Sequence, residues 1–477
     1  MSPTKRCLKV GIFESKEHLI MLVKKPKTTK SSAKAWVVTV DMGYGHQRAA
    51  YPLHDIAYDG IIAINDYKGL PESERHTWRQ SRQGYEWISR FQAHSFIGRA
   101  AFKLFDHIQE IPAFYPRRDL SRQTLQLLQT YYAIEKKGLG HHLFTKVLSK
   151  QPKLPLVCTF FLPAFAAEIY GYEGDIYLQV CDADISRTWV PRNPQKSRIK
   201  YFASNPRVVE RLRLYGVRPE NILATGFPLP KENIGTESME ILKEDIAARI
   251  AQLDPECAMR HKFGHIINYH IGKRLIPKKQ KRPLTIAFAI GGAGAQSDIA
   301  LQALESLRTK LVKKELRLIL VAGSRQDTAD MLEVAIKELK LSKELGKSLF
   351  ILIEKTKFEY FKKFNEVLRH TDILWTKPSE LSFYAALGLP IIMAPSVGSQ
   401  EDFNRIWLKT IAAGISQDDP RYTDEWLFDW VKSGWLARAA LNGFSGAPIN
   451  GIFEIEKIVA NPNYKPNHFA DMSSLAV

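Results

Sequence analysis

The fold is decided by two stretches of sequence, Ala35-Trp-Val-Val-Thr-Val-Asp-Met-Gly-Tyr-Gly-His46 and Leu284-Thr-Ile-Ala-Phe-Ala-Ile-Gly-Gly-Ala-Gly-Ala-Gln-Ser297. Each begins with an apolar run typical of a parallel strand that is covered on both faces, and each passes through a glycine-rich turn into a helical stretch. Such a turn places free backbone N–H groups and a helix start at the carboxyl end of a first strand, which favours phosphate. Each half of the chain therefore predicts its own Rossmann-like unit.

Further strands alternate with helical segments after each of these turns. In the first half we predict strands at 60–65, 154–160, 175–180, 199–203 and 222–228, and in the second half at 316–323, 349–354, 373–375 and 390–395. This alternation is typical of doubly wound parallel sheets. We therefore expect an α/β protein with two Rossmann-like domains that face a central cleft.

The expected domain boundaries follow changes in composition. A chain of 477 residues suits two domains, because single cores stop growing near about 250–300 residues. We expect the divisions to be a basic N-terminal segment at 1–34, a first domain at 35–232 with a helical insert at 71–150, a second helical insert with a basic linker at 233–283, a second domain at 284–440, and a C-terminal helix and tail at 441–477.

The charge of the chain is strongly positive and unevenly distributed. The net charge is +18, and residues 1–230 hold 34 Lys and Arg against 20 Asp and Glu, a balance of +14 that leaves +4 for the remainder. A positive surface attracts anionic partners, such as lipid headgroups or anionic glycans, although it can also serve solubility alone. The sequence has no zinc-finger, RNP or basic-zipper pattern, so specific nucleic-acid recognition is not predicted.

No segment has the pattern of a membrane span or a secretory signal. The most apolar stretch, 154–167, is shorter than the about 20 residues that a spanning helix needs, and 1–20 lacks an unbroken apolar region. We expect a cytoplasmic location. The predicted helix at 91–111 mixes aromatic and basic side chains, which suits either packing within the protein or peripheral association with the inner face of a membrane.

The sequence predicts no metal site and no bound cofactor. Its four cysteines are far apart and lack the paired spacing of a zinc or redox site, and no pair of histidines has the HExxH arrangement. Nicotinamide or flavin binding is also disfavoured, because Gly43-x-Gly45-x-x-Arg48 has arginine where the dinucleotide fingerprint has glycine.

His46 and Asp182 are the candidates for proton transfer. His46 follows the first glycine turn, where a histidine can accept a proton from a hydroxyl near neutral pH, or can only make a local hydrogen bond. Asp182 follows the strand that ends at Val180, where it can be a second base or can only cap the next turn.

Three polar segments of the second half follow three different strands, at 291–297, 376–380 and 395–404. The carboxyl ends of parallel strands share one edge of the sheet, which is the usual ligand crevice of an open α/β domain. Ser379 can cap the helix that begins after it, and Glu380 can accept hydrogen bonds from a ribose diol or can only complement the helix dipole. The turn at 291–297 lacks the Gly-Lys-Ser/Thr end of a P-loop, so kinase and ATPase chemistry is disfavoured.

Four motifs resemble those of GT-B glycosyltransferases of the diacylglycerol glycosyltransferase and peptidoglycan N-acetylglucosaminyltransferase group. Asp41-Met-Gly-Tyr-Gly-His-Gln-Arg-Ala-Ala50 is similar to their Gly-Gly-Gly-His-Arg-Ala or Gly-Gly-His segment, and Thr225-Gly-Phe-Pro228 to their Thr-Gly-Ile-Pro. Ile290-Gly-Gly-Ala-Gly-Ala295 resembles their Gly-Gly-Ser-x-Gly-Ala loop. Thr376-Lys-Pro378 with Gly388-Leu-Pro390 resembles their Thr-Lys-Pro-Gly-Gly and Gly-Leu-Pro signatures.

This resemblance, which spans residues 36–408, implies a GT-B glycosyltransferase without an essential metal. The acceptor would bind the first domain and a nucleotide sugar, most simply a UDP-sugar, the second, and His46 or Asp182 would be the base of an inverting displacement. Gly43, Gly45 and Asp184 would lie on the acceptor side. The implied donor-binding residues are Gly291, Gly292, Gly294, Ala295, Gln296, Ser324, Lys377, Ser379, Glu380, Gln400, Glu401 and Asn404.

Some alternatives stay open at this point. Counted back from Gly388-Leu-Pro390, the family's ribose-binding glutamate corresponds to Phe383, and only a shifted alignment assigns it to Glu380. A nucleotide-sugar epimerase would share the architecture, and so would a non-catalytic nucleotide-binding protein. The acceptor is undefined, with a lipid or an anionic glycan favoured by the charge of the first half.

Overall fold

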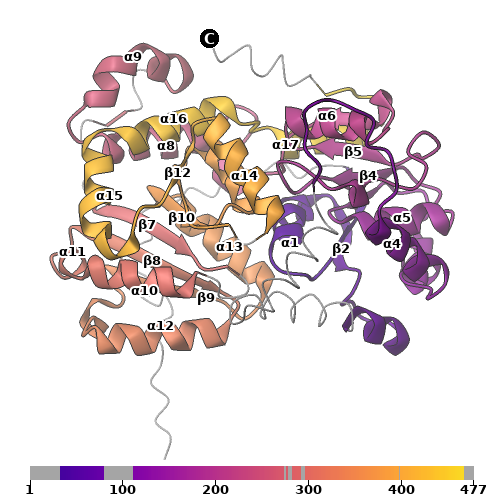
Figure 1. Ribbon diagram of the computed structural model, residues 1–477, viewed down its shortest axis with the longest axis horizontal. Coiled ribbons are helices and arrows are strands. Elements are labelled where there is room, and N and C mark those ends of the chain that lie inside the picture. Colours follow the sequence, from indigo (N-terminus) through magenta and orange to yellow (C-terminus); the bar gives the residue numbers. More distant parts are fainter. Residues whose placement is uncertain are drawn as a thin grey trace, which may run out of the picture.

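The computed structural model describes residues 33–79, 111–272, 276–277, 282–291, 296–396 and 398–466. Its ribbon shows two lobes side by side, with the first half of the chain in indigo and magenta and the second half in salmon and orange (Figure 1). Each lobe contains one parallel sheet with helices around it. The predicted helix at 91–111 lies, apart from Ile111, outside the described residues.

The first domain is built on a six-stranded parallel sheet in the order β2-β1-β3-β4-β5-β6. In a sheet that begins 2-1-3, the chain turns to opposite sides after β1 and after β3, so the switch point lies between these two strands. The strands are β1 (Ala35–Thr39), β2 (Ala57–Ala63), β3 (Leu156–Cys158), β4 (Ile176–Gln179), β5 (Lys200–Ala203) and β6 (Ile222–Ala224).

The helices of the first domain begin at recognisable capping residues. Asn205 accepts a hydrogen bond from the backbone N–H of Val208 and precedes Pro206, and Thr124 accepts one from Leu127, so both side chains satisfy free donors of a first turn. Residues 72–79 are also helical. The other helices are α1 (Gly45–Ala50), η1 (Tyr51–Asp55), α4 (Leu125–Glu135), η2 (Leu143–Val147), η3 (Leu148–Lys150), α5 (Phe161–Ile169), η4 (Arg187–Trp189), α6 (Pro206–Leu214) and η5 (Pro219–Asn221).

The second domain contains a six-stranded parallel sheet in the order β9-β8-β7-β10-β11-β12. Numbered within the domain, this is the 3-2-1-4-5-6 order of a Rossmann sheet, whose switch point lies between its first and fourth strands. Here those strands are β7 and β10. The strands are β7 (Leu284–Ala289), β8 (Leu316–Gly323), β9 (Leu349–Ile353), β10 (Ile373–Thr376), β11 (Ile391–Met393) and β12 (Gly414–Ser416).

Helices cover both faces of this second sheet and continue beyond it. Residues 380–387 form a 3-10 helix, η7, which is longer than the three or four residues usual for that helix type. The other helices are α10 (Ser297–Ser306), α11 (Arg308–Val312), α12 (Gln326–Glu338), η6 (Ser342–Glu344), α13 (Lys357–Leu368), α14 (Ser399–Thr410), η8 (Pro420–Tyr422), α15 (Thr423–Lys432), α16 (Trp435–Gly446) and α17 (Gly451–Ala460).

Three helices connect the two sheets, α7 (Lys231–Ile234), α8 (Glu240–Leu253) and α9 (Ala258–His270). The chain then returns to the first domain at its last helix, because α17 lies among first-domain elements in the ribbon (Figure 1). There Lys231 Nζ lies 2.6 Å from Glu456 Oε1. A Cβ on Gly451 would lie 2.4 Å from the carbonyl oxygen of Phe227, so only glycine permits this close packing.

The predicted fold class, an α/β protein with two Rossmann-like domains, is confirmed by the two parallel sheets. Every strand predicted from the sequence is present, although β2 starts three residues earlier than the predicted 60–65. One strand, β12, was not predicted. It consists of Gly414, Ile415 and Ser416, so it lacks the apolar run that identified the others.

Candidate functional site

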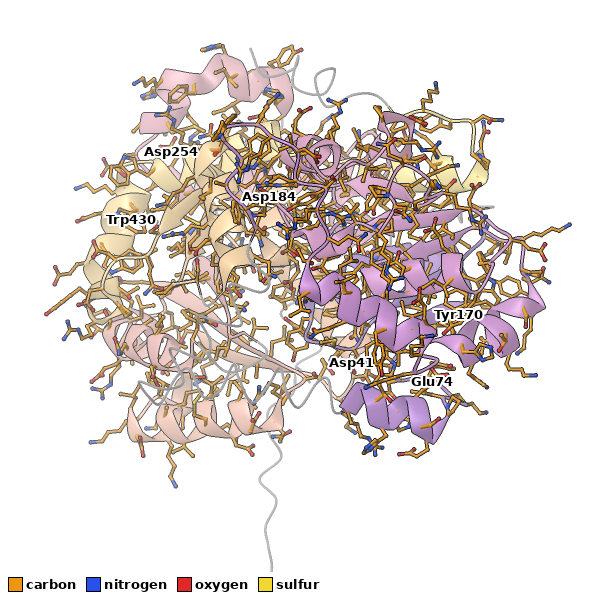
Figure 2. The ribbon with its side chains drawn as sticks, turned by 45° about the vertical axis from the view of Figure 1, so that its right-hand side comes forward. Asp41, Glu74, Tyr170, Asp184, Asp254 and Trp430 are labelled. Atoms are coloured by element: carbon orange, nitrogen blue, oxygen red, sulfur yellow. The ribbon has the colours of Figure 1, made fainter. Side chains whose placement is uncertain are left out.

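The carboxyl ends of the two sheets lie against each other, and several side chains form hydrogen bonds across the border between the domains. Tyr44, from the turn after β1, places its phenol oxygen 2.9 Å from the backbone nitrogen of Ser324, after β8. Lys357, at the start of α13, forms an ion pair with Asp41 and donates to the carbonyl of Gly43. Asp41 lies where the two lobes meet (Figure 2). The carboxyl ends of the two sheets therefore share one border.

His46 lies at the switch point of the first sheet. Its Nδ1 is 2.8 Å from the carbonyl oxygen of Thr159, the residue after β3. A carbonyl can only accept, so Nδ1 carries the proton and Nε2 keeps its lone pair. Burial lowers the pKa of His46 to about 4, against a smaller raising effect of the Thr159 carbonyl. At pH 7 this imidazole is neutral and is a weaker base than an ordinary histidine.

Asp182 lies close to the same place and is held from the second domain. Asn404, on α14, donates through Nδ2 to Asp182 Oδ1 at 3.0 Å, and its Oδ1 accepts from the backbone N–H of Ala183 at 2.7 Å. Burial raises the pKa of Asp182 to about 6, with the Asn404 hydrogen bond acting in the opposite direction. The amide of Asn404, predicted to bind the donor, is therefore committed to the turn that carries Asp182.

Of the two candidates for proton transfer, Asp182 is the stronger base and His46 the weaker one. The Asp182 carboxyl, with a pKa of about 6, takes up a proton more readily than His46, with a pKa of about 4. The two candidates lie close together, because Cys181, the residue before Asp182, places its Sγ 3.3 Å from the Thr159 oxygen that also contacts His46. Near neutral pH, Asp182 is thus the stronger base of the two side chains.

Asp184, expected on the acceptor side, is instead a structural residue of the first domain. One oxygen accepts from Arg211 Nε at 2.7 Å and from the backbone N–H of Ile185, and the other accepts from Arg211 Nη2 and Arg207 Nε. The side chain is buried, so neither oxygen is left for an acceptor molecule. Asp182 and Asp184 therefore have different surroundings, although only one residue lies between them.

The glycines of the first turn have different roles. Gly43 has a φ of +83°, which a residue with a side chain rarely adopts, and its carbonyl receives Lys357. Gly45 begins α1, and a Cβ there would lie 3.4 Å from Glu380 Oε2. Both glycines therefore lie at the border with the second domain, and Gly45 leaves space beside a carboxylate of that domain.

At the second switch point, Gly291, Gln296 and Lys377 come together. Gln296 Oε1 accepts from the backbone N–H of Gly291, and a Cβ on Gly291 would lie 3.2 Å from Lys377 Cε. Lys377 also forms an ion pair with Glu401. The predicted donor residues Gly292, Gly294 and Ala295 lie outside the described residues.

Glu380, a predicted donor residue, is held from the first domain. It begins η7, and its Oε1 lies 3.1 Å from Arg48 Nε, with Arg48 only 1% exposed. Phe383, the alternative position for the ribose-binding glutamate, is buried and stacks on Phe227 with ring centroids 4.7 Å apart. The structure thus places a carboxylate at the border at position 380.

The remaining predicted residues lie near this border with less specific contacts. Ser379 precedes η7 but makes no side-chain capping hydrogen bond, so its predicted capping role is wrong. Ser324 receives the Tyr44 phenol, and Gln400 lies in the first turn of α14. Within the described ranges, no group of three or more His, Cys, Asp or Glu side chains could hold a metal ion.

Sequence reasoning missed the residues that join the two domains. The sequence marks Arg48 as a departure from the dinucleotide fingerprint and, with Tyr44, as part of the glycine-rich motif at 41–50, but neither pattern indicates an interdomain contact. Lys357, Tyr360 and Thr159 had no signal, because their partners lie far away along the chain. Arginine in place of the third glycine, at a position where the chain should pack closely, was the one available clue.

Comparisons with known proteins give a family match for part of the chain and distant structural likenesses for most of it. Residues 258–417, about a third of the chain, match a family described as a domain of unknown function, DUF6938. No curated protein matches the sequence. None of the helices in the described ranges is both long enough and apolar enough to span a membrane.

Three of the similar solved structures illustrate the range. Acinetobacter baumannii MurG is 14% identical over 90% of this chain and 99% of its own, with a TM-score of 0.42. A putative UDP-N-acetylglucosamine 2-epimerase from Listeria monocytogenes is 12% identical over 92% and 99%, with a TM-score of 0.46. A glycosyltransferase from Rickettsia africae is 12% identical over 90% and 100%, with a TM-score of 0.40. The chemistry has to be argued from the residues of this chain.

Proposed function

We propose that this protein is a glycosyltransferase that takes a sugar from a nucleoside diphosphate donor, most simply a UDP-sugar, and passes it to a hydroxyl group. The observation that carries the proposal is the contact between Asp182 and Asn404, which joins a base of raised pKa in the first domain to the ligand edge of the second. A transfer between two substrates requires side chains of both domains to lie close together. The motif resemblance implies that the donor binds the second domain, so the sugar would pass from there to an acceptor in the first domain.

In the proposed reaction the acceptor oxygen attacks the anomeric carbon while the Asp182 carboxylate accepts the hydroxyl proton. The bond from the anomeric carbon to the diphosphate oxygen breaks, and both of its electrons leave with the diphosphate. Lys377, beside Gly291 at the second switch point, is the cation placed to interact with that charge. Attack from the face opposite to the leaving group inverts the anomeric centre.

His46 has a supporting role in this proposal. Its protonated Nδ1 is fixed by the Thr159 carbonyl, so its Nε2 is oriented as a hydrogen-bond acceptor. With its pKa lowered to about 4, it stays neutral, and Nε2 can accept a hydrogen bond from a substrate hydroxyl other than the attacking one, whose single proton goes to Asp182. The excess of positive charge in the first half favours an anionic acceptor, either a glycan or a lipid at a membrane surface.

The first experiment is isothermal titration of the purified chain with UDP, GDP, CDP and ADP, followed by incubation with the sugar donor of the best-bound nucleotide. We expect micromolar binding of one diphosphate and slow release of that diphosphate from its sugar donor. Lys377→Ala should weaken binding about tenfold or more through the lost charge. Lys409→Ala, an exposed position on α14, is the matched control and should bind normally.

The products distinguish the competing functions. A free diphosphate together with a free or transferred sugar supports transfer. An epimerised sugar that stays attached to its nucleotide would identify an epimerase, and binding without any turnover would identify a non-catalytic nucleotide-binding protein. Failure of all four diphosphates to bind would contradict the proposal.

A further inference from the structure

The further inference concerns Arg48, a first-domain residue whose side chain is received entirely by the second domain. Its Nε lies 3.1 Å from Glu380 Oε1 and its Nη2 lies 2.9 Å from the Tyr360 phenol oxygen. Its guanidinium carbon lies 4.7–5.9 Å from the centroids of four rings, all from the second domain, namely Tyr360, Phe361, Phe364 and Tyr384. Arg48 thus inserts into an aromatic cage across the domain border.

This cage fixes the guanidinium in one position. Four aromatic faces and one carboxylate hold the charge, and the side chain is only 1% exposed, so it cannot exchange these partners for water. Nη1 is buried without a hydrogen-bond acceptor. An orphaned donor beside aromatic rings is tolerated because the rings themselves attract the positive charge.

Glu380 is held by Arg48 through one oxygen only. Among the described residues no hydrogen-bond donor reaches Oε2, the second oxygen. Gly45 contributes no side chain on that side, since a Cβ there would lie 3.4 Å from Oε2. The Glu380 side chain keeps 10% of its surface exposed, so this second oxygen is free to accept a hydrogen bond from water or from a ligand.

We propose that Arg48 is a positioning residue that holds the Glu380 carboxylate so that Oε2 is presented to a ribose hydroxyl of the bound nucleotide. This inference rests on the proposed function. It goes further, because it makes recognition of the ribose depend on a residue of the opposite domain. The ribose of a bound nucleotide is then recognised only while the two domains are in contact.

The test compares a ribonucleoside diphosphate with its 2′-deoxy counterpart. The full chain is titrated with the best of UDP, GDP, CDP and ADP and with the matching deoxynucleotide. We expect the ribonucleotide to bind about tenfold more tightly, because the loss of one hydroxyl removes a hydrogen bond to a charged carboxylate oxygen. In Arg48→Met this ratio should fall to about one, whereas Arg48→Lys should keep part of it.

Arg211→Met is the matched control. Arg211 is equally buried, but it pairs with Asp184 inside the first domain, so its loss should lower stability while the ratio stays near tenfold. Thermal melting of each variant confirms that the titrated protein is folded.

Two results would overturn the inference without touching the proposed function. One is a folded Arg48→Met chain that keeps the full ratio, and the other is an unmodified chain that binds both nucleotides equally. If the unmodified chain binds no nucleoside diphosphate at all, the proposed function itself fails, and this inference fails with it.

Discussion

Two fully buried arginines, Arg249 in α8 and Arg48 in α1, show how the same side chain is accommodated in different ways. Arg249 donates only to backbone carbonyls of the second domain, at 2.7–3.2 Å, those of Leu368, Thr371, Leu387 and Gly388. Arg48 is met by one carboxylate, one phenol and four rings, and it leaves Nη1 without an acceptor. A buried side chain whose donors find acceptors in this way stabilises the fold. The interdomain cluster of His46, Arg48, Asp182, Glu380 and Asn404 contains polar atoms without a protein partner, so it can still bind a ligand.

The largest effect should come from Arg249. Arg249→Met removes donors from four buried carbonyls at the ends of α13 and η7. The carbonyl of Leu368 keeps the backbone N–H of Thr371, and each of the other three costs about 1–3 kcal/mol when left unpaired. We expect a loss of about 5 kcal/mol, measured as a fall in melting temperature of roughly 10 °C. We expect the folded fraction to bind nucleotide normally, and a loss of stability below about 1 kcal/mol would contradict the structural role given to Arg249.

The second effect concerns rescue. Arg48→Met strands the Glu380 carboxylate in a buried place and should cost about 3 kcal/mol. The double variant Arg48→Met with Glu380→Met should recover most of that loss, since apolar side chains often replace a buried ion pair without penalty. No second substitution can compensate for Arg249→Met in this way, because the acceptors of Arg249 are backbone carbonyls. Urea unfolding followed by tryptophan fluorescence measures both, and a double variant as unstable as the single one would refute this account.

The third effect is the acid sensitivity contributed by His46. Its folded pKa of about 4 lies below the ordinary 6.5, so its contribution to stability is present above pH 6.5 and is lost as the pH falls through 4. His46→Gln has no such titration. Between pH 7 and pH 4 the unmodified chain should therefore lose about 2–3 kcal/mol more than His46→Gln. Melting curves that shift in parallel across this pH range would exclude the effect.

The smallest effect has the opposite sign and separates Asp182 from Asp184. The folded pKa of Asp182, about 6, lies above the ordinary 3.8, so its stabilising contribution exists below pH 3.8 and is lost as the pH rises through 6. Asp182→Asn should therefore be more stable than the unmodified chain at pH 8 by roughly 1–2 kcal/mol, with no gain at pH 4.

Asp184→Asn is the matched change for that experiment. It breaks the ion pairs with Arg207 and Arg211, so it should destabilise the chain at both pH values. A stabilising Asp184→Asn, or an Asp182→Asn that destabilises at pH 8, would contradict the roles given to the two carboxylates.

The strands could be predicted from the sequence because their signal is local. The runs at β1, β7 and β8 are apolar and rich in branched side chains, which suits strands buried on both faces. The contrast between Asp182 and Asp184 could not be predicted in the same way. It depends on Arg207 and Arg211, one helical turn apart on α6, and these reach Asp184 only after β4 and β5 have paired.

The candidate site could be predicted only within each half of the chain. Motifs identified His46, Lys377 and Glu380 separately, because each follows a strand or a glycine turn. They could not show that Arg48 reaches Glu380, because these residues meet only when two independent sheets come together. The capping role predicted for Ser379 failed for a related reason, since the segment after it forms a 3-10 helix whose first turn is fixed by packing.

The return of α17 to the first domain has a consequence for how the molecule can be divided. Lys231 holds Glu456, and Gly226 and Gly451 pack closely enough to exclude side chains, so the last helix completes a surface that begins more than two hundred residues earlier. The first lobe is therefore not a continuous piece of the chain. A cut between β6 and β7 would leave the N-terminal fragment with an exposed apolar face, because α17, which covers that face, would stay in the C-terminal fragment. The two fragments should therefore regain the native fold only when they associate.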